Sequence, residues 1–262
     1  MRALLLAGGL GTRLRPITDV VPRCLVPVLQ RPLLDYWLDL LFEAGIERTL
    51  INTHYLADKV RAYIASSRWR DRIDLVHEPE LLGTGGTIRA NRIFFEDESF
   101  LVAHADNLAH FDVAGLIEAH HARPKNTVLT MLAFRTDDPS SCGILELDAR
   151  SVVQAFHEKT PDPPGNLANA AIYVMAPEAL AELARFDRPF IDLSTELIPQ
   201  LMGRIFAVET SGYLRDIGNA ESLRRAHLEY SHWITIRATG QKNSRGARLT
   251  IQPHVAENSV DI

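Results

Sequence analysis

The segment LLLAGGLGTRLRP, residues 4–16, runs from an apolar stretch directly into a loop with three glycines and two arginines. A short, continuously apolar stretch is typical of a strand buried on both faces of a parallel sheet. Open parallel sheets bind ligands at the carboxyl ends of their strands, where this loop begins. Glycines let backbone N–H groups approach an anion, and Arg13 and Arg15 add permanent positive charge suited to phosphate oxygens. We therefore expect the loop to hold a phosphate-bearing ligand.

The chain that follows alternates apolar strands with amphipathic helices. Residues 32–45 have helical spacing, with Pro32 and Gly45 at the ends that tolerate them. This alternation predicts an α/β fold: an open, mainly parallel but mixed, Rossmann-like sheet with helices on both faces. The expected strands are 49–53, 73–78, 99–106 and 127–134, and the further helices are 58–66 and 113–122.

The pattern changes near Cys142. Residues 143–148 and 151–159 flank a short turn and predict a small β-hairpin. Residues 233–262 are polar and weakly patterned, so we expect one domain, 1–232, followed by a loosely ordered C-terminal tail, 233–262. The other elements expected in this half are strands at 169–175 and 204–210, a helix at 194–202 capped by Ser194, and a helix at 220–230.

Composition and charge restrict the partners of the chain. A formal net charge of -5 over 262 residues argues against a general nucleic-acid binder, which normally carries a basic surface. The sequence has neither a signal-peptide layout nor an apolar stretch long enough to cross a bilayer. Cys24 and Cys142 form no metal-type spacing and no disulfide framework. We expect a cytoplasmic protein that binds neither nucleic acid nor membrane.

Two other glycine-rich motifs fit the loop less well. A dinucleotide fingerprint needs glycine where Leu14 stands and an acidic residue after the second strand, where the chain reads INTHY. A Walker loop ends in Gly-Lys-Ser/Thr, which this segment lacks. A tight turn with two solvated arginines is the remaining alternative, and the loop alone does not decide between this turn and phosphate binding.

The longer segment LAGGLGTRLRPITDVVPRCLVPV, residues 6–28, resembles the signature of the nucleotide-sugar pyrophosphorylases, the sugar-1-phosphate nucleotidyltransferases. The resemblance covers about residues 2–230 and is greatest to small guanylyltransferases that act on mannose- or heptose-1-phosphate. It continues, in chain order, through EPELLGTGGTIR (78–89), VAHADN (102–107), FHEK (156–159), LANAAIYV (167–174) and GYLRDIGNAESLRRAH (212–227).

This resemblance implies an enzyme that transfers a nucleoside monophosphate from an NTP, with GTP favoured, to a sugar 1-phosphate. Pyrophosphate leaves and an NDP-sugar forms. Two like charges about 4 Å apart repel by roughly 4 kcal/mol at an effective dielectric of about 20, so two polyanionic substrates need cations nearby. The implied partners are the NTP and the sugar 1-phosphate, and the implied cofactor is Mg²⁺.

Two arginines match catalytic positions of the family that the chain resembles. Arg13 matches the loop arginine that would hold the triphosphate and stabilise the leaving pyrophosphate. Arg23 stands where the family usually carries lysine, so a planar guanidinium replaces a compact ammonium. We expect Arg23 to act in place of that lysine; the alternative is a site with reduced turnover.

Asp106 and Asp216 match the two acids that hold one magnesium ion in this family. Asp106 ends an apolar run and should emerge at the ligand edge of the sheet, and Asp216 precedes the last helix. Magnesium takes oxygen ligands and usually needs only one or two protein carboxylates. Helix capping or turn formation is the alternative role for both residues.

The remaining site residues follow from the same resemblance. Sugar-phosphate binding is implied for Glu158, Lys159 and Asn169. The family often has glycine where Ala170 stands, which would narrow the space beside the sugar. Nucleotide binding is implied for Ala7, Gly8, Gly9, Gly11, Thr12, Glu80, Gly83, Thr84, Gly85 and Asn107.

Two other functions stay open. A non-catalytic, nucleotide-sugar-binding regulatory homologue is favoured by Arg23 and Ala170, but the presence of both aspartates counts against it. Cytidylyl transfer to a non-sugar phosphate is disfavoured by the sugar-binding set. The histidines lack zinc-type spacing and are expected to be structural or at the surface. The sequence leaves homo-oligomer formation open.

Overall fold

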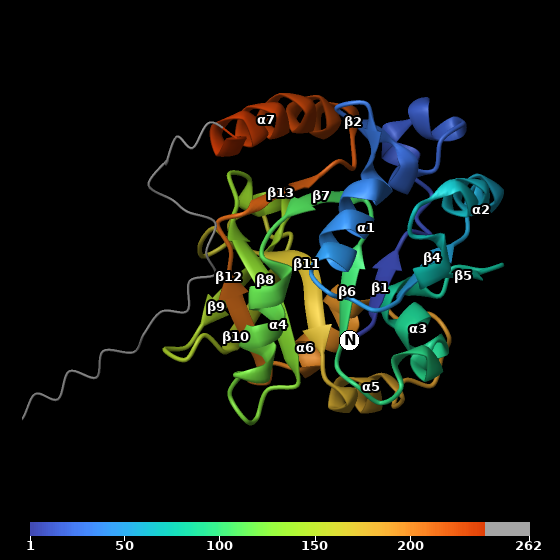
Figure 1. Ribbon diagram of the computed structural model, residues 1–262. Helices are drawn as coiled ribbons and strands as arrows, with labels where there is room; N and C mark the ends of the chain where they lie inside the picture. The colour runs from blue at the N-terminus through green and yellow to red at the C-terminus, as the bar shows by residue number, and fades with distance from the viewer. Residues whose placement is uncertain (239–262) are drawn as a thin grey trace, which may run out of the picture.

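The computed structural model describes residues 1–238, and a nine-stranded mixed sheet forms the centre of this part of the chain (Figure 1). Its strands are β1 (Ala3–Leu6), β4 (Thr49–Thr53), β5 (Ile73–His77), β6 (Phe100–His104), β8 (Leu129–Arg135), β9 (Gly143–Leu147), β10 (Val153–Glu158), β11 (Leu167–Met175) and β12 (Ile205–Glu209).

The strand order agrees with the predicted mixed, mainly parallel sheet. β5, β4, β1 and β6 lie side by side and run parallel. β11 lies next to β6 and antiparallel to it, and β8 pairs antiparallel with the other edge of β11. β12 then pairs parallel with β8. The predicted hairpin is β9–β10, which joins the sheet where Ile144 pairs with Ala168 of β11.

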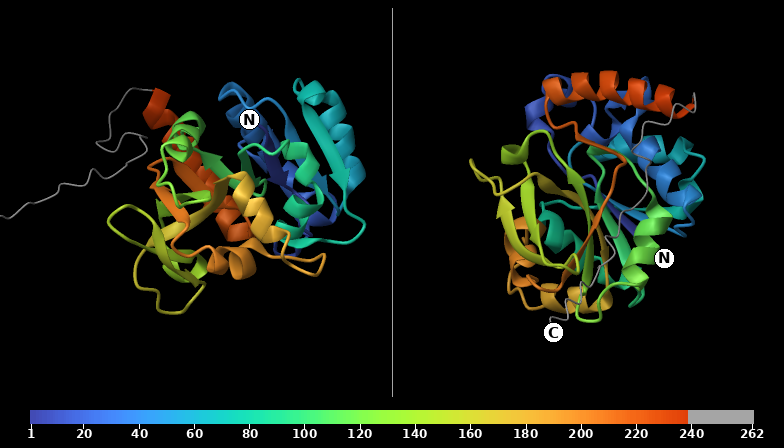
Figure 2. Two further views of the ribbon diagram at one scale, coloured as in Figure 1. Left: turned by 90° about the horizontal axis from the view of Figure 1, so that it is seen from below. Right: turned by 90° about the vertical axis from the view of Figure 1, so that its left-hand side faces the viewer.

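Helices cover both faces of the sheet, as predicted (Figure 2). The continuous apolar run of β1 is explained by this burial, because Ala3 and Leu5 belong to one core, whereas Leu4 and Leu6 belong to the other. The helices of the first core are α1 (Leu33–Glu43), α2 (Ala57–Ser66) and α4 (Val113–His121), and those of the second are α3 (Gly83–Ala90), α5 (Pro177–Leu183) and α6 (Ile198–Gln200).

A third, smaller core lies beneath the long helix α7 (Ala220–Ala238), which crosses one end of the molecule in Figure 1. Two short antiparallel sheets contribute to it: β2 (Pro27–Val28) with β3 (Arg31–Pro32), and β7 (Asn107–His110) with β13 (Tyr213–Asp216). This core joins the glycine loop, through Leu14, to the segment that carries Asp216.

Two sequence predictions need correction. The domain boundary predicted after residue 232 falls inside α7, which continues to Ala238. The Trp233 ring stacks on Tyr230 across this boundary, with 5.5 Å between centroids. The tail prediction otherwise concerns residues 239–262, which lie outside the described part of the chain. The predicted Ser194 cap is also wrong, since Asp192 caps this segment by accepting a 2.9 Å hydrogen bond from the backbone N–H of Thr195.

Within residues 1–238, no helix is both long enough and apolar enough to span a membrane. The helical turns of residues 194–202 are a π-helical segment, Leu193–Leu197, followed by α6. Cys24 and Cys142 are both free thiols.

Candidate active site

The first backbone amide of the glycine loop, directly after β1, is held by a side chain of the neighbouring strand. The backbone N–H of Ala7 donates to Oδ1 of Asn52 on the neighbouring strand β4, at 2.7 Å. A Cβ added to Gly8 would lie 2.9 Å from Nδ2 of the same Asn52, so only glycine fits there without a shift. Gly9 faces open space. The start of the loop is therefore held in place by Asn52, and the backbone at Gly9 is accessible.

The second half of the loop turns sharply toward the arginines. Gly11 has a left-handed backbone, with φ of 66°, and its carbonyl accepts a 2.7 Å hydrogen bond from the hydroxyl of Thr18. Thr12 then begins a 3-10 helix, Thr12–Leu14, that carries Arg13. The Arg13 side chain is 65% exposed. A charged, largely exposed donor therefore lies beside the loop amides, as phosphate binding requires.

The pairing of β7 with β13 brings the two predicted metal-binding aspartates together. Asp106 follows β6 and directly precedes Asn107, the first residue of β7. Asp216 ends β13, and its partner in the β7–β13 register is Asn107. The backbone carbonyl of Asn107 is fixed by the indole N–H of Trp37 at 2.8 Å. Asp106 and Asp216 thus come to the same edge of the fold, at the carboxyl end of β6.

Arg23 lies between these carboxylates. Its Nη1 atom is 2.8 Å from Oδ2 of Asp106, and its Nη2 atom pairs with Oδ1 of Asp216. Nη2 of Arg13 lies 3.9 Å from the other oxygen of Asp216. A Cβ added to Gly218 would come within 3 Å of Arg13, Arg23 and Asp216 alike, so this glycine keeps the cluster closed on one side. The structure brings the predicted catalytic arginines and metal-binding aspartates into one cluster.

A buried polar network that the sequence analysis missed connects the loop to α3. Glu78, which is 3% exposed, accepts hydrogen bonds from Asn52 Nδ2 at 3.1 Å and Thr87 Oγ1 at 2.6 Å. Its second oxygen accepts from the backbone N–H of Leu82 at 3.3 Å. The sequence signal for this network is an asparagine within the buried strand TLINT. Glu80, the predicted base-contacting acid, is exposed two residues further along.

The predicted nucleotide-binding residues of α3 are close-packed against the segment before the π-helix. Gly83 has φ of +72°, and a Cβ there would lie 2.5 Å from the carbonyl oxygen of Ile191. The N–H of Gly85 donates to that same oxygen at 2.8 Å, and the hydroxyl of Thr84 accepts from the N–H of Leu193 at 2.7 Å. Helix packing thus already requires small residues here, and a role toward the nucleobase stays a prediction.

The predicted sugar-binding residues come together where the β9–β10 hairpin meets β11. Glu158 ends β10, and Lys159 Nζ lies 3.4 Å from its Oε1. Asn169 Nδ2 donates to the hydroxyl of buried Tyr173 at 2.8 Å, and its Oδ1 accepts from the N–H of Ala171 at 2.9 Å. Both hydrogen bonds fix the Asn169 amide within the bulge of β11. The β11–β6 register leads the start of β11 toward the end of β6, where Asp106 follows.

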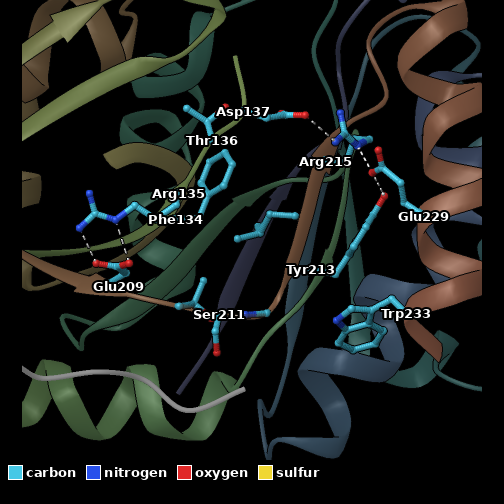
Figure 3. Close-up of a pocket in the computed structure, with 13 residues that line it drawn as sticks. Phe134, Arg135, Thr136, Asp137, Glu209, Ser211, Tyr213, Arg215, Glu229 and Trp233 are labelled. Atoms are coloured by element: carbon cyan, nitrogen blue, oxygen red, sulfur yellow. Dashed lines mark hydrogen bonds and ion pairs between the residues drawn. The ribbon is translucent and has the colours of Figure 1, made fainter. Parts of the chain in front are cut away.

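A cavity of about 570 Å³ lies elsewhere, between the ends of β8 and β12, strand β13 and helix α7 (Figure 3). None of the predicted site residues lines it. Its charged side chains pair with one another: Arg135 Nε lies 3.0 Å from Glu209, and Arg215 Nε lies 2.5 Å from Glu229. The cavity is therefore separate from the cluster of Arg23 and the aspartates.

Residues 2–232 match the nucleotidyl transferase family. The chain belongs to this family. A mannose-1-phosphate guanylyltransferase catalytic subunit beta from Xenopus tropicalis is 30% identical over 250 residues, which are 88% of this chain and 68% of the relative. A mannose-1-phosphate guanylyltransferase from Mycobacterium tuberculosis is 30% identical over 232 residues, which are 87% of this chain and 64% of the relative. The chain thus spans about two thirds of the length of these relatives.

The fold is also found in solved structures. HddC from Yersinia pseudotuberculosis superposes with a TM-score of 0.73 at 24% identity, covering 87% of this chain and 99% of that one. The predicted family and the predicted Rossmann-like fold are therefore both confirmed.

Proposed function

We propose that this protein transfers a nucleoside monophosphate from an NTP to a sugar 1-phosphate and releases pyrophosphate. The observation that carries the proposal is the convergence of Arg13, Arg23, Asp106 and Asp216 beside the glycine loop. The names of the relatives support the same reaction class.

The residues at this edge suit an in-line phosphoryl displacement, which depends mainly on positioning and charge neutralisation. Exposed Arg13 and the backbone near Gly9, which faces open space, would hold the triphosphate and stabilise charge on the leaving pyrophosphate. Glu158, Lys159 and Asn169 would hold the sugar 1-phosphate. The sugar phosphate oxygen then attacks the α-phosphorus opposite the pyrophosphate.

Asp106 and Asp216 are the residues that would hold Mg²⁺. Their carboxylate oxygens are the donors that Mg²⁺ prefers, and this ion usually needs only one or two protein carboxylates besides phosphates and water. When bound, Mg²⁺ supplies charge neutralisation to the phosphates. In the described structure Arg23 contacts both carboxylates, so it already provides part of that positive charge.

GTP and a mannose-type sugar 1-phosphate are the proposed substrates, because both relatives described above carry the name mannose-1-phosphate guanylyltransferase. A heptose-type acceptor is the next candidate. The sugar contacts expected from Glu158 and Asn169 are few, so they alone do not separate these two sugars.

The test is pyrophosphate release by the full chain with each common NTP and a panel of mannose-, glucose- and heptose-1-phosphates. We expect turnover to require GTP and Mg²⁺, and to fall roughly 100-fold or more in Asp106→Asn. Asp74→Asn is the matched control, because Asp74 pairs with Arg48 at the outer strand β5, far from the cluster. Equal rates in Asp106→Asn and the wild type would contradict the proposal.

A nucleotide-sugar-binding protein without turnover is the second candidate. It is favoured by one observation, the engagement of both aspartates by Arg23. This candidate predicts saturable binding of GDP-sugar, measured by calorimetry, together with no pyrophosphate release from any NTP and sugar 1-phosphate in the panel.

A further inference from the structure

Arg23 is far more enclosed than the other arginine of the cluster. The Arg23 side chain is 12% exposed, whereas that of Arg13 is 65% exposed. Nη1 of Arg23 contacts Asp106, and Nη2 contacts Asp216. A single guanidinium therefore bridges the same two carboxylates that would hold a divalent cation.

This placement leaves one donor of Arg23 unused. Nε of Arg23 is buried and has no hydrogen-bond partner among the described residues. Buried N–H groups are ordinarily paired, so the two carboxylates, rather than a complete set of hydrogen bonds, hold the guanidinium in this position. The backbone of Gly218 closes one side, since a Cβ there would lie 2.8 Å from Nη2. A guanidinium held mainly by two ion pairs is released when another cation binds the two carboxylates in its place.

The guanidinium and a divalent cation need the same carboxylate oxygens. Mg²⁺ binds oxygen at about 2.0–2.1 Å, which leaves no room for a guanidinium N–H on the same lone pair. Once displaced, an arginine fork matches phosphate oxygens with two parallel hydrogen bonds. A lysine at this position would carry its charge on one small ammonium, which is poorly shaped to bridge two carboxylates in this way.

We propose that Arg23 is a displaceable counter-ion of Asp106 and Asp216. In the free protein it neutralises both carboxylates and keeps unbound divalent cations from them. When an NTP arrives with its cation, the carboxylates engage that cation and Arg23 transfers to a phosphate. Only this last step rests on the proposed function; the competition between Arg23 and the cation does not.

The experiment measures Mn²⁺ binding to the nucleotide-free full chain by electron paramagnetic resonance of the unbound ion. Arg23→Ala should bind Mn²⁺ about tenfold or more tightly than the wild type, because it frees two carboxylates and removes a positive charge. Adding Asp106→Asn to Arg23→Ala should abolish the gain. Arg15→Ala is the charge-matched control: Arg15 belongs to the same loop but pairs with Asp19, at 3.2 Å.

Equal Mn²⁺ affinity in the wild type and a folded Arg23→Ala, checked by circular dichroism, would overturn the proposal, and so would an equal gain in Arg15→Ala. Arg23→Lys gives a second comparison if the alanine variant does not fold, with an expected gain of about threefold. Pyrophosphate release is assayed separately. If Arg23→Ala gains Mn²⁺ affinity but the wild type releases no pyrophosphate, the counter-ion role stands and the proposed reaction is refuted. If the wild type releases pyrophosphate but Arg23→Ala shows no gain, the proposed reaction stands and the counter-ion role is refuted.

Discussion

Asn52 and Glu78 are joined beneath the glycine loop by a hydrogen bond of 3.1 Å from Nδ2 to Oε1. Oδ1 of the same Asn52 amide accepts from the N–H of Ala7 at 2.7 Å. Glu78 in turn accepts from Thr87 of α3 and from the N–H of Leu82. One buried amide thus fixes the start of the glycine loop relative to the start of α3.

Asn52→Ala should therefore destabilise the protein and weaken NTP binding together. It leaves the Ala7 N–H without its acceptor and removes a donor from buried Glu78, which costs about 1–3 kcal/mol of unfolding free energy. Urea unfolding and the KM for the NTP measure the two effects. Asn166→Ala, at an exposed amide that accepts from Arg135, should cost under about 0.5 kcal/mol. An unchanged KM in a destabilised Asn52→Ala would show that the network supports only the fold.

Gly83→Ala tests whether close packing of α3 requires glycine. Both Gly83 and Gly45 have positive φ, 72° and 90°, but only Gly83 has a backbone neighbour that a Cβ would strike. Gly45→Ala should cost about 1–2 kcal/mol through backbone strain alone. Gly83→Ala should cost a further 1–3 kcal/mol or so, because Ile191 must move. Equal losses for the two variants in urea unfolding would contradict this account.

The sequence predicts the central sheet well because its inner strands β1, β4 and β6 are buried on both faces and the helices that pack on it have clear apolar periodicity. The start of α3 escapes prediction for a physical reason. Its first residues, GTGG, have poor intrinsic helix propensity, and packing against Ile191 rather than propensity makes them helical. The last turns of α7 escape prediction because a polar composition hides the stacking of Trp233 on Tyr230.

The site is only partly predictable for a related reason. The resemblance places Asp106 and Asp216 in one site, but their proximity depends on the short β7–β13 pairing, which has little sequence signal of its own. Arg23 is visible in the sequence as a departure from lysine. Its position between the two carboxylates depends on three separate segments of the chain meeting in space, so it is found only in the structure.

His120 should make stability depend on pH. The ring lies buried between the hydroxyls of Thr130 and Ser99, and burial, followed by the charge of Arg123, lowers its pKa to about 3. The folded ring stays neutral, whereas the unfolded ring takes up a proton below about pH 6.5. The unfolded state thus binds more protons between these values, so stability is full above pH 6.5 and is lost as pH falls.

Urea unfolding at several pH values between 7 and 5 measures this contribution. The free energy of unfolding should fall as pH is lowered, and the slope that this group contributes should approach about 1.4 kcal/mol per pH unit below pH 6.5. His120→Gln should remove that slope, whatever its own cost in stability. His121→Gln, at the exposed neighbouring histidine, should retain it. Parallel pH curves for His120→Gln and the wild type would contradict the assignment.

Glu158→Gln should separate sugar binding from nucleotide binding. The Glu158 side chain is 28% exposed at the end of β10, and its ion pair with Lys159 lies at the surface, so the variant should fold normally. Loss of a charged acceptor for sugar hydroxyls should raise the KM for the sugar 1-phosphate about tenfold and leave the KM for the NTP within about twofold. Initial rates with both substrates varied provide the two values.

The matched control is Glu146→Gln on the same hairpin. Glu146 pairs with His157 across β9 and β10, at 2.6 Å, and its side chain is 52% exposed. The Glu146→Gln substitution removes the same charge from the same hairpin without altering Glu158, so both KM values should stay near those of the wild type. A similar rise in the sugar-phosphate KM for both variants would assign the effect to the charge of the hairpin rather than to hydrogen bonds that Glu158 accepts from the sugar.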